Sequence, residues 1–193
     1  LWGPPGCGKT TLGRLLAQRV RNAHSISLSA CTATLKDLRA AFVEAENRRK
    51  LNAASNTVLM IDEIHRFNKL QLDALLPPVE SGLITLIGAT TENPSFEVNA
   101  ALLSRVTVVT LPKHTDEQLL SILHRAVVDG VCGVRGDGRS SGRRVRVVLE
   151  RKAALAIVVA ADGDARRALN ALERAYGAAL SSSSGGGGDG SGG

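Results

Sequence analysis

The chain has 193 residues, of which 44% are hydrophobic and 22% charged, and its formal net charge is +6. This composition is ordinary for a globular protein and excludes wholesale disorder, and no apolar run approaches the roughly 20 residues that a membrane span needs. The three cysteines, Cys7, Cys31 and Cys132, lack zinc-ligand spacing and are too few for a disulfide scaffold, so they indicate a reducing compartment.

The chain opens at Leu1 with neither an initiator Met nor a signal peptide, which predicts a fragment that has lost upstream sequence. Its first motif, G-x-x-x-x-G-K-[ST], is typical of a phosphate-binding loop. Glycines let backbone N–H groups curl around phosphate oxygens, Lys9 brings a positive charge to the β- and γ-phosphates, and the Thr10 hydroxyl is a ligand for Mg²⁺. The motif comprises Gly3, Pro4, Pro5, Gly6, Cys7, Gly8, Lys9 and Thr10.

Two segments with helical character follow this loop. Residues 11–17 predict a helix whose N-terminal dipole favours the bound anion. Gly13 is a weak helix former and costs about 1 kcal/mol there relative to Ala. The second segment has apolar residues at i, i+3, i+7 and i+10, which lie on one helical face: Leu35, Leu38, Phe42 and Ala45.

Three continuous apolar runs indicate buried parallel strands, because such strands are covered on both faces. They span residues 57–61, 83–89 and 106–111. Between the first two runs, residues 69–80 predict a helix that Pro77 and Pro78 end. Strands that alternate with helices indicate an α/β fold, in which helices flank a parallel P-loop-type sheet.

Two adjacent carboxylates, Asp62 and Glu63, come directly after the first apolar strand. A side chain at the carboxyl end of a buried parallel strand faces the ligand crevice of an α/β sheet. We therefore expect Asp62 to hold Mg²⁺, directly or through water, and Glu63 to orient and deprotonate an attacking water molecule. The alternative for this pair is a strand-end cap.

After Thr115 the pattern is helical alone, which predicts a small helical lid. We expect an α/β nucleotide-binding domain over residues 1–112, a lid over residues 113–180 and a disordered Ser/Gly tail over residues 181–193. An exposed basic loop over residues 130–146 interrupts the lid. Residues 135–152 hold seven basic and two acidic side chains, so they either contact nucleic-acid phosphates or form a solvated Arg-rich insertion. Aromatic residues, at 3%, are too rare for base stacking.

Two long strings carry a resemblance to a known family. They are DEIHRFNK over residues 62–69 and GATTENPSFEVNAALLSR over residues 88–105. Together with the phosphate loop, they resemble the AAA+ ATPases of the Werner-helicase-interacting and replication-associated recombination protein A family, which is related to clamp loaders. The resemblance covers about residues 1–130 and 150–178, and it implies an AAA+ sheet followed by a helical lid. The insertion at residues 130–146 matches no motif of the family.

The resemblance also implies roles for single residues. The segment from Gly3 to Thr11 matches the nucleotide loop, and Asp62 and Glu63 match the metal-binding and catalytic acids. Thr91 matches the polar residue that senses the γ-phosphate, with Asn93 as the nearby alternative. Arg105 matches the arginine finger, which reaches the neighbouring subunit's site. Arg166 matches the second sensor on the lid, and Arg167 competes with it for that role.

The expected function is Mg²⁺-dependent ATP hydrolysis by an oligomer, coupled to remodelling of DNA or protein at replication forks. The alternatives are a clamp-loader-type ATPase subunit, and a fragment that binds nucleotide and DNA without hydrolysis. DNA, further copies of the chain and replication or repair proteins are the expected partners, and no membrane is expected. The resemblance implies a nuclear location in a eukaryote and a cytoplasmic one in a bacterium.

Overall fold

The computed structural model describes residues 1–129 and 148–184. The chain divides into two compact units, Leu1–Pro112 and Lys113–Gly193, and each is described here by itself. The expected basic loop over residues 130–146 lies outside the described residues, as do residues 185–193. No described helix has the length and apolar character that a membrane crossing requires.

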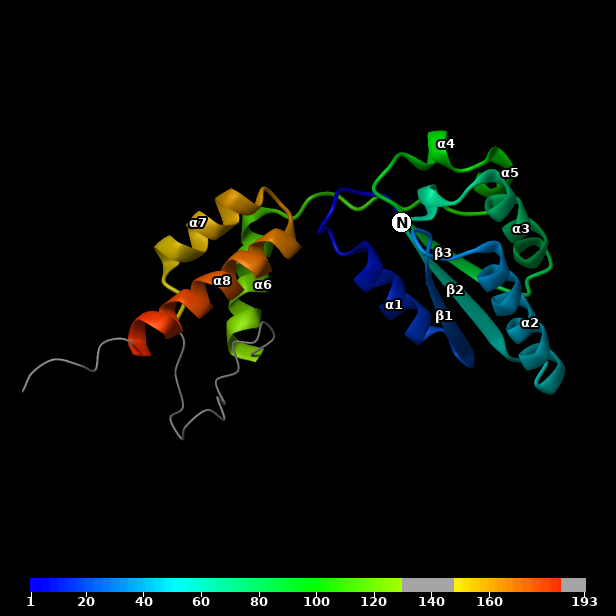
Figure 1. Ribbon diagram of the computed structural model, residues 1–193, viewed down its shortest axis with the longest axis horizontal. Helices are drawn as coiled ribbons and strands as arrows, with labels where there is room; N and C mark the ends of the chain where they lie inside the picture. Colours follow the sequence, from blue (N-terminus) through cyan, green and yellow to red (C-terminus); the bar gives the residue numbers. More distant parts are fainter. Residues whose placement is uncertain (130–147, 185–193) are drawn as a thin grey trace, which may run out of the picture. The chain divides into compact units, whose positions relative to one another are not determined.

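A three-stranded parallel sheet forms the centre of the first unit. Its order is β1 (Ala23–Ser29), β2 (Asn56–Asp62), β3 (Thr85–Ala89) (Figure 1). Asp62 at the end of β2 is in register with Ser29 of β1 and Ala89 of β3. The carboxyl ends of the three strands therefore lie at the same edge of the sheet, and the predicted parallel α/β fold is confirmed.

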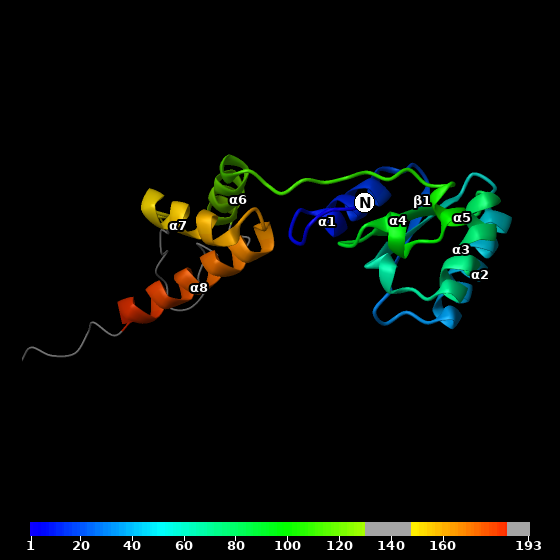
Figure 2. The same ribbon diagram turned by 90° about the horizontal axis from the view of Figure 1, so that it is seen from above.

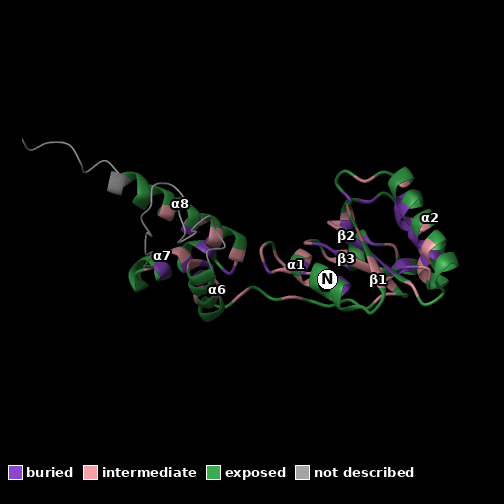
Figure 3. Cartoon of the chain, turned by 90° about the horizontal axis from the view of Figure 1, so that it is seen from below, coloured by how far each residue is buried: buried purple, intermediate pink, exposed green. Residues whose placement is uncertain are grey.

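Helices cover both faces of this sheet, and the alternation of side chains along β2 explains how. Leu59 and Ile61 point into a core shared with α2 (Leu35–Leu51) and α3 (Lys69–Glu80). Met60 points the other way, where it faces Gly13 of α1 (Lys9–Arg19). Figure 1 shows α1 on one side of the strands and α2 and α3 on the other. Because both faces are covered, residues 57–61 are all buried (Figure 3).

The helices α2 and α3 each begin with a capping box. Thr34 accepts a hydrogen bond from the Asp37 N–H and Asp37 accepts one from the Thr34 N–H, and Asn68 and Gln71 make the same exchange for α3. Each pair satisfies two backbone donors that the first helical turn would leave without partners. Short helices follow β2 and β3: η1 (Ile64–Arg66), α4 (Pro94–Glu97) and α5 (Ala100–Leu103).

The helix predicted over residues 69–80 is confirmed as α3, but Pro77 and Pro78 lie inside it and do not end it. They stand in the last turn, where the fixed φ of proline suits a helix, and each removes one hydrogen bond to the carbonyl four residues earlier. The carbonyl of Pro77 accepts a hydrogen bond from Ser81 N–H, and that of Pro78 accepts one from Leu83 N–H.

The strand predicted over residues 106–111 is also absent as a regular strand. Its backbone makes a single parallel bridge, Trp2 with Thr110, while Trp2 bridges Thr90 on its other side. Residues 106–111 thus pair with the chain around Trp2 only where Trp2 supplies its backbone N–H and carbonyl groups.

The second unit is helical, as predicted, with α6 (Asp116–Asp129), α7 (Arg151–Ala161) and α8 (Ala165–Ser184) (Figure 2). Its core includes Leu119, Leu123, Val158 and Leu172, all buried. Since α8 extends through Ser184, the first four residues of the expected tail, 181–184, are helical instead. Serine is only about 0.5 kcal/mol less favourable than alanine in a helix, so a helix begun upstream propagates into it at little cost.

Candidate functional site

The phosphate loop runs from Gly3 to Gly8 and leads directly into α1. Gly6 and Gly8 have φ of 68° and 93°, a left-handed conformation that glycine adopts without strain. Gly8 is the N-cap residue of α1, so the loop ends at the N-terminus of this helix, where backbone N–H groups without helical partners favour an anion. This backbone arrangement is suited to bind an anion.

Lys9, the first residue of α1, is only 7% exposed. Its ammonium donates hydrogen bonds to the carbonyl oxygens of Gly3 and Pro4, each at 2.9 Å, and lies 4.0 Å from the Cys7 sulfur. The loop therefore wraps around this ammonium group and holds a positive charge at its centre.

Thr10 and Asp62 lie together although they are 52 positions apart in the sequence. The Thr10 hydroxyl is 3.2 Å from one carboxylate oxygen of Asp62 and 3.1 Å from the other. Three hard oxygen atoms thus stand beside the phosphate loop, and such atoms are the ligands that Mg²⁺ prefers. Mg²⁺ in nucleotide sites takes one or two protein oxygens and completes its shell with phosphate and water, so these residues fit the ion.

Glu63 is placed by an unusual backbone conformation. Its φ of 54° and ψ of 46° are left-handed, and this turn ends β2 and begins η1. This conformation costs a non-glycine residue about 1–3 kcal/mol, and residues that adopt it cluster at functional sites. The Glu63 Oε2 atom is 3.4 Å from the Thr91 hydroxyl and 3.3 Å from His65 Nδ1.

Thr91 and Asn93, the two candidates for the sensing role, have different surroundings. Thr91 donates its hydroxyl hydrogen to Glu63. Asn93 instead caps α4, where its side-chain oxygen accepts a hydrogen bond of 3.0 Å from Ser95 N–H. The tertiary structure therefore brings Thr91 to the carboxylate pair, while it uses the side-chain oxygen of Asn93 at a helix terminus.

Arg105 is exposed at the end of α5, away from these contacts. Its guanidinium pairs with Glu80 at 2.5 Å and donates hydrogen bonds to the Ala101 carbonyl at 2.6 Å and the Ser104 hydroxyl at 2.9 Å. Glu80, at the end of α3, was missed by sequence reasoning, and no local pattern connects two residues 25 positions apart. The structure thus holds Arg105 through α3 and α5 and links it to no residue of the phosphate loop.

Arg166 and Arg167 lie in the second unit, in the first turn of α8. Their backbone N–H groups donate to Asp164 Oδ1 at 2.8 and 3.0 Å, so Asp164 caps this helix. Both arginine residues are exposed. They differ in one respect: the pKa of the Asp162 carboxyl is lowered by its hydrogen bond with Lys113, by the charge of Lys113 and also by the charge of Arg167.

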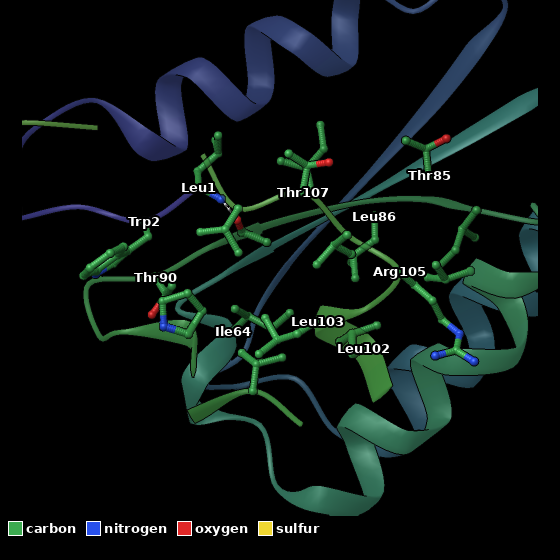
Figure 4. A pocket seen from close by; sticks show the side chains of 18 of the residues that line it. Leu1, Trp2, Ile64, Thr85, Leu86, Thr90, Leu102, Leu103, Arg105 and Thr107 are labelled. Atoms are coloured by element: carbon green, nitrogen blue, oxygen red, sulfur yellow. Dashed lines mark hydrogen bonds between the residues drawn. The ribbon is translucent and has the colours of Figure 1, made fainter. Parts of the chain in front are cut away.

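A cavity of about 530 Å³ lies beside the site, between β3 and residues 105–108 (Figure 4). Leu1 and Trp2 stand at one end of it and Arg105 at the other. The Leu1 ammonium donates a hydrogen bond of 2.7 Å to the Gly88 carbonyl, and burial, followed by the charge of Lys9, lowers the pKa of this amino group. Leu1 and Trp2 therefore form part of the wall of this cavity.

Comparison with known proteins gives a family and several relatives. The family model described as "ATPase family associated with various cellular activities (AAA)" matches residues 1–112. Replication-associated recombination protein A of Escherichia coli K12 is 47% identical over 173 residues, which are 90% of this chain and 36% of that protein. The protein named ATPase WRNIP1 in Dictyostelium discoideum is 45% identical over 175 residues, 91% of this chain and 19% of that protein.

A solved structure gives the same picture. Thermotoga maritima RuvB T158V matches with a TM-score of 0.64 at 26% identity, over 90% of this chain and 52% of that one. These relatives confirm the resemblance found in the strings at residues 62–69 and 88–105. The chain spans about a third, or less, of the length of the two curated relatives.

Proposed function

Because this chain belongs to the AAA family of ATPases, we propose that its first unit binds ATP with Mg²⁺ and hydrolyses it to ADP and phosphate. The observation that carries the proposal is the meeting of four side chains at the carboxyl ends of β2 and β3. Thr10 contacts Asp62, and Thr91 contacts Glu63. These pairs lie next to the loop that surrounds the Lys9 ammonium.

The residues of the loop bind and orient the triphosphate. The loop binds the phosphate oxygens through the backbone N–H groups that follow Pro5, up to Thr11 at the helix N-terminus, and Lys9 exchanges its carbonyl partners for the β- and γ-phosphates. Thr10 and Asp62 would hold Mg²⁺, which when bound neutralises charge that develops on the phosphates. In this proposal Arg166, or its neighbour Arg167, has the role of the second sensor that the family resemblance implies.

Glu63 carries the chemical step. Its carboxylate accepts a proton from a water molecule as the water oxygen forms a bond to the γ-phosphorus. The bond from that phosphorus to the bridging oxygen breaks, and ADP leaves with the electron pair. Thr91 donates a hydrogen bond to Glu63 and helps to place the water, and Asn93 is the alternative residue for this role.

Arg105 completes the site of a neighbouring copy in this proposal. It is exposed and is held by contacts from α3 and α5, so it can present its charge outward. An arginine finger in related phosphate-loop enzymes is worth about 10³–10⁵ in rate. We therefore propose that hydrolysis requires a homo-oligomer.

The relatives direct the cellular proposal. Replication-associated recombination protein A and ATPase WRNIP1 are the names of proteins about 45–47% identical to this chain. We propose that hydrolysis drives remodelling of DNA or of a DNA-bound protein at replication forks, with replication or repair proteins as partners. ATP turnover measured against protein concentration, with and without forked DNA, tests this. Specific activity that rises with both supports an assembled, DNA-coupled motor, and activity indifferent to both contradicts it.

The substitution Glu63→Gln tests the hydrolytic proposal directly. General base catalysis contributes roughly 10²–10⁴ in rate, so steady-state turnover falls by about that factor while ATP binding is kept. Glu46→Gln, at an exposed position on α2, is the matched control and leaves turnover unchanged. Wild-type turnover by the Glu63→Gln protein would remove Glu63 from the mechanism.

A further inference from the structure

The His65 imidazole lies between the acid of the site and the end of β3. It belongs to η1, and its side chain is 9% exposed. Its Nδ1 atom is 3.3 Å from Glu63 Oε2 and 2.9 Å from the Thr90 hydroxyl. The proposed hydrolysis gives no role to His65, although its two neighbours in these contacts, Glu63 and Thr90, lie at the edge of the site.

The position of the Nδ1 hydrogen follows from the partners. A carboxylate only accepts hydrogen bonds, whereas a hydroxyl donates one and accepts two. The Thr90 hydroxyl receives a hydrogen bond from Glu92 N–H at 3.1 Å and donates one to the Glu92 carbonyl at 3.3 Å. Its remaining capacity is therefore that of an acceptor, and Nδ1–H of His65 fills it.

The opposite tautomer does not fit these contacts. If Nδ1 carried no hydrogen, its lone pair would face the lone pairs of Glu63 Oε2 at 3.3 Å, which is repulsive. The Thr90 hydroxyl would also have to turn away from the Glu92 carbonyl in order to donate to the ring. With Nδ1–H, the ring donates its hydrogen to the Thr90 oxygen, and the positive edge of the N–H group lies 3.3 Å from Glu63 Oε2.

Thr90 connects this hydrogen bond to the phosphate loop. Its backbone N–H donates to the Leu1 carbonyl at 3.0 Å, and its carbonyl accepts from Gly3 N–H at 3.3 Å. Within the described residues, the contacts of the Glu63 carboxylate are made through Oε2, with Thr91 and with His65. The other oxygen, Oε1, is left to meet a water molecule.

We propose that His65 is a positioning residue, which holds the Glu63 carboxylate by its Oε2 atom and ties it through Thr90 to the end of β3 and the first residue of the phosphate loop. The inference rests on the proposed function, in which Glu63 accepts the proton of the attacking water. It assigns distinct uses to the fourth and fifth letters of the sequence IDEIH: Ile64 enters the core, and His65 orients the acid.

Two substitutions separate this role from simple packing. Phenylalanine in His65→Phe keeps a ring but has no donor, and in His65→Asn the side-chain NH₂ can stand where Nδ1–H stood. A misplacement of about 1 Å can cost up to roughly 10²-fold in rate, so His65→Phe lowers kcat by about tenfold to a hundredfold. Because Lys9, Thr10 and Asp62 are untouched, KM for ATP stays within about twofold of wild type. His65→Asn restores most of kcat.

The controls place the effect on Glu63. His24, which pairs with Glu44 at 2.8 Å, is the matched histidine, and His24→Asn leaves kcat unchanged. If His65 acts through Glu63, the double variant Glu63→Gln/His65→Phe is no slower than Glu63→Gln alone. Independent, multiplicative losses, or a change confined to KM, would overturn the inference. Failure of Glu63→Gln itself to slow turnover would instead refute the proposed function.

A spectroscopic measurement tests the contact without any turnover. In ¹⁵N-labelled full-length chain at pH 8, the imidazole nitrogen shifts of His65 report which nitrogen carries hydrogen. The inference requires the Nδ1–H tautomer in the wild type, and a weaker preference for it in Glu63→Ala and in Thr90→Val. An Nε2–H ring in the wild type, or a ring indifferent to both substitutions, would refute the positioning role whatever the kinetics are.

Discussion

Gly13→Ala sets helix propensity against packing at one position of α1. Propensity alone favours alanine by about 1 kcal/mol. The structure opposes it, because a Cβ atom at Gly13 would lie 2.8 Å from Met60 Cε, 3.1 Å from Met60 Sδ and 3.3 Å from Ile87 Cγ2. Met60 is fully buried in the middle strand, so its end can move only by disturbing other core atoms. Overpacking of this kind costs about 1–3 kcal/mol.

The difference of these terms predicts that Gly13→Ala lowers the free energy of unfolding of the first unit by about 1 kcal/mol. Gly177→Ala is the matched control, since Gly177 lies in α8 and a Cβ there would meet nothing within 4 Å. That substitution realises the propensity gain of about 1 kcal/mol in the second unit. The same chemical change therefore has opposite signs in two helices.

Urea unfolding followed by tryptophan fluorescence measures the first effect, because Trp2 is the only tryptophan of the chain and belongs to the first unit. Amide hydrogen exchange along α8 measures the second. In a Met60→Val background the Cε and Sδ atoms are gone, and Gly13→Ala recovers most of its propensity gain. A gain of about 1 kcal/mol for Gly13→Ala in the wild type would refute the packing argument.

Two further predictions concern the neighbouring copy and the amino group of Leu1. Chains with Arg105→Ala and chains with Glu63→Gln are each nearly inactive, but a mixture recovers turnover if the finger acts between copies, and a mixture that stays inactive places Arg105 in its own site. In a polypeptide that starts at Leu1, the pKa of the amino group is lowered from 8.0 in the folded state, so folding favours the neutral amine. The first unit therefore has its full stability above pH 8.0 and loses this contribution as the pH falls through the lower pKa of the folded state.

Elements with strong local signals were predictable. The capping residues Thr34 and Asn68, and the continuous apolar run of β2, mark their elements by short-range chemistry and by complete burial. β1 was missed because it lies at the edge of the sheet, and its residues alternate between half-buried and exposed instead of forming an apolar run. The apolar run over residues 106–111 did not form the predicted buried strand: residues 107–110 are exposed, and their one bridge joins Thr110 to Trp2.

The features of the candidate site also fall into those that local sequence indicates and those that it does not. The spacing of the phosphate loop and the Asp62-Glu63 pair after an apolar strand indicate the chemistry, because ligand type and strand position are local properties. Which groups meet those residues was not predictable. The contacts of Glu63 with Thr91 and His65, and of Arg105 with Glu80, depend on where β3, η1 and α3 end relative to one another.

The sequence by itself determined the phosphate loop, the acids that follow β2, the parallel α/β architecture and the helical second unit, since each is encoded by residue type and periodicity within a short window. Only the tertiary structure decided that Asn93 caps a helix while Thr91 contacts the acid, that Pro77 and Pro78 remain inside α3, and that Gly13 is where α1 meets Met60. The physical reason is that hydrogen-bond partners and close approaches are set by distances between elements, and those distances arise when strands far apart in the chain align their ends at one edge of a sheet.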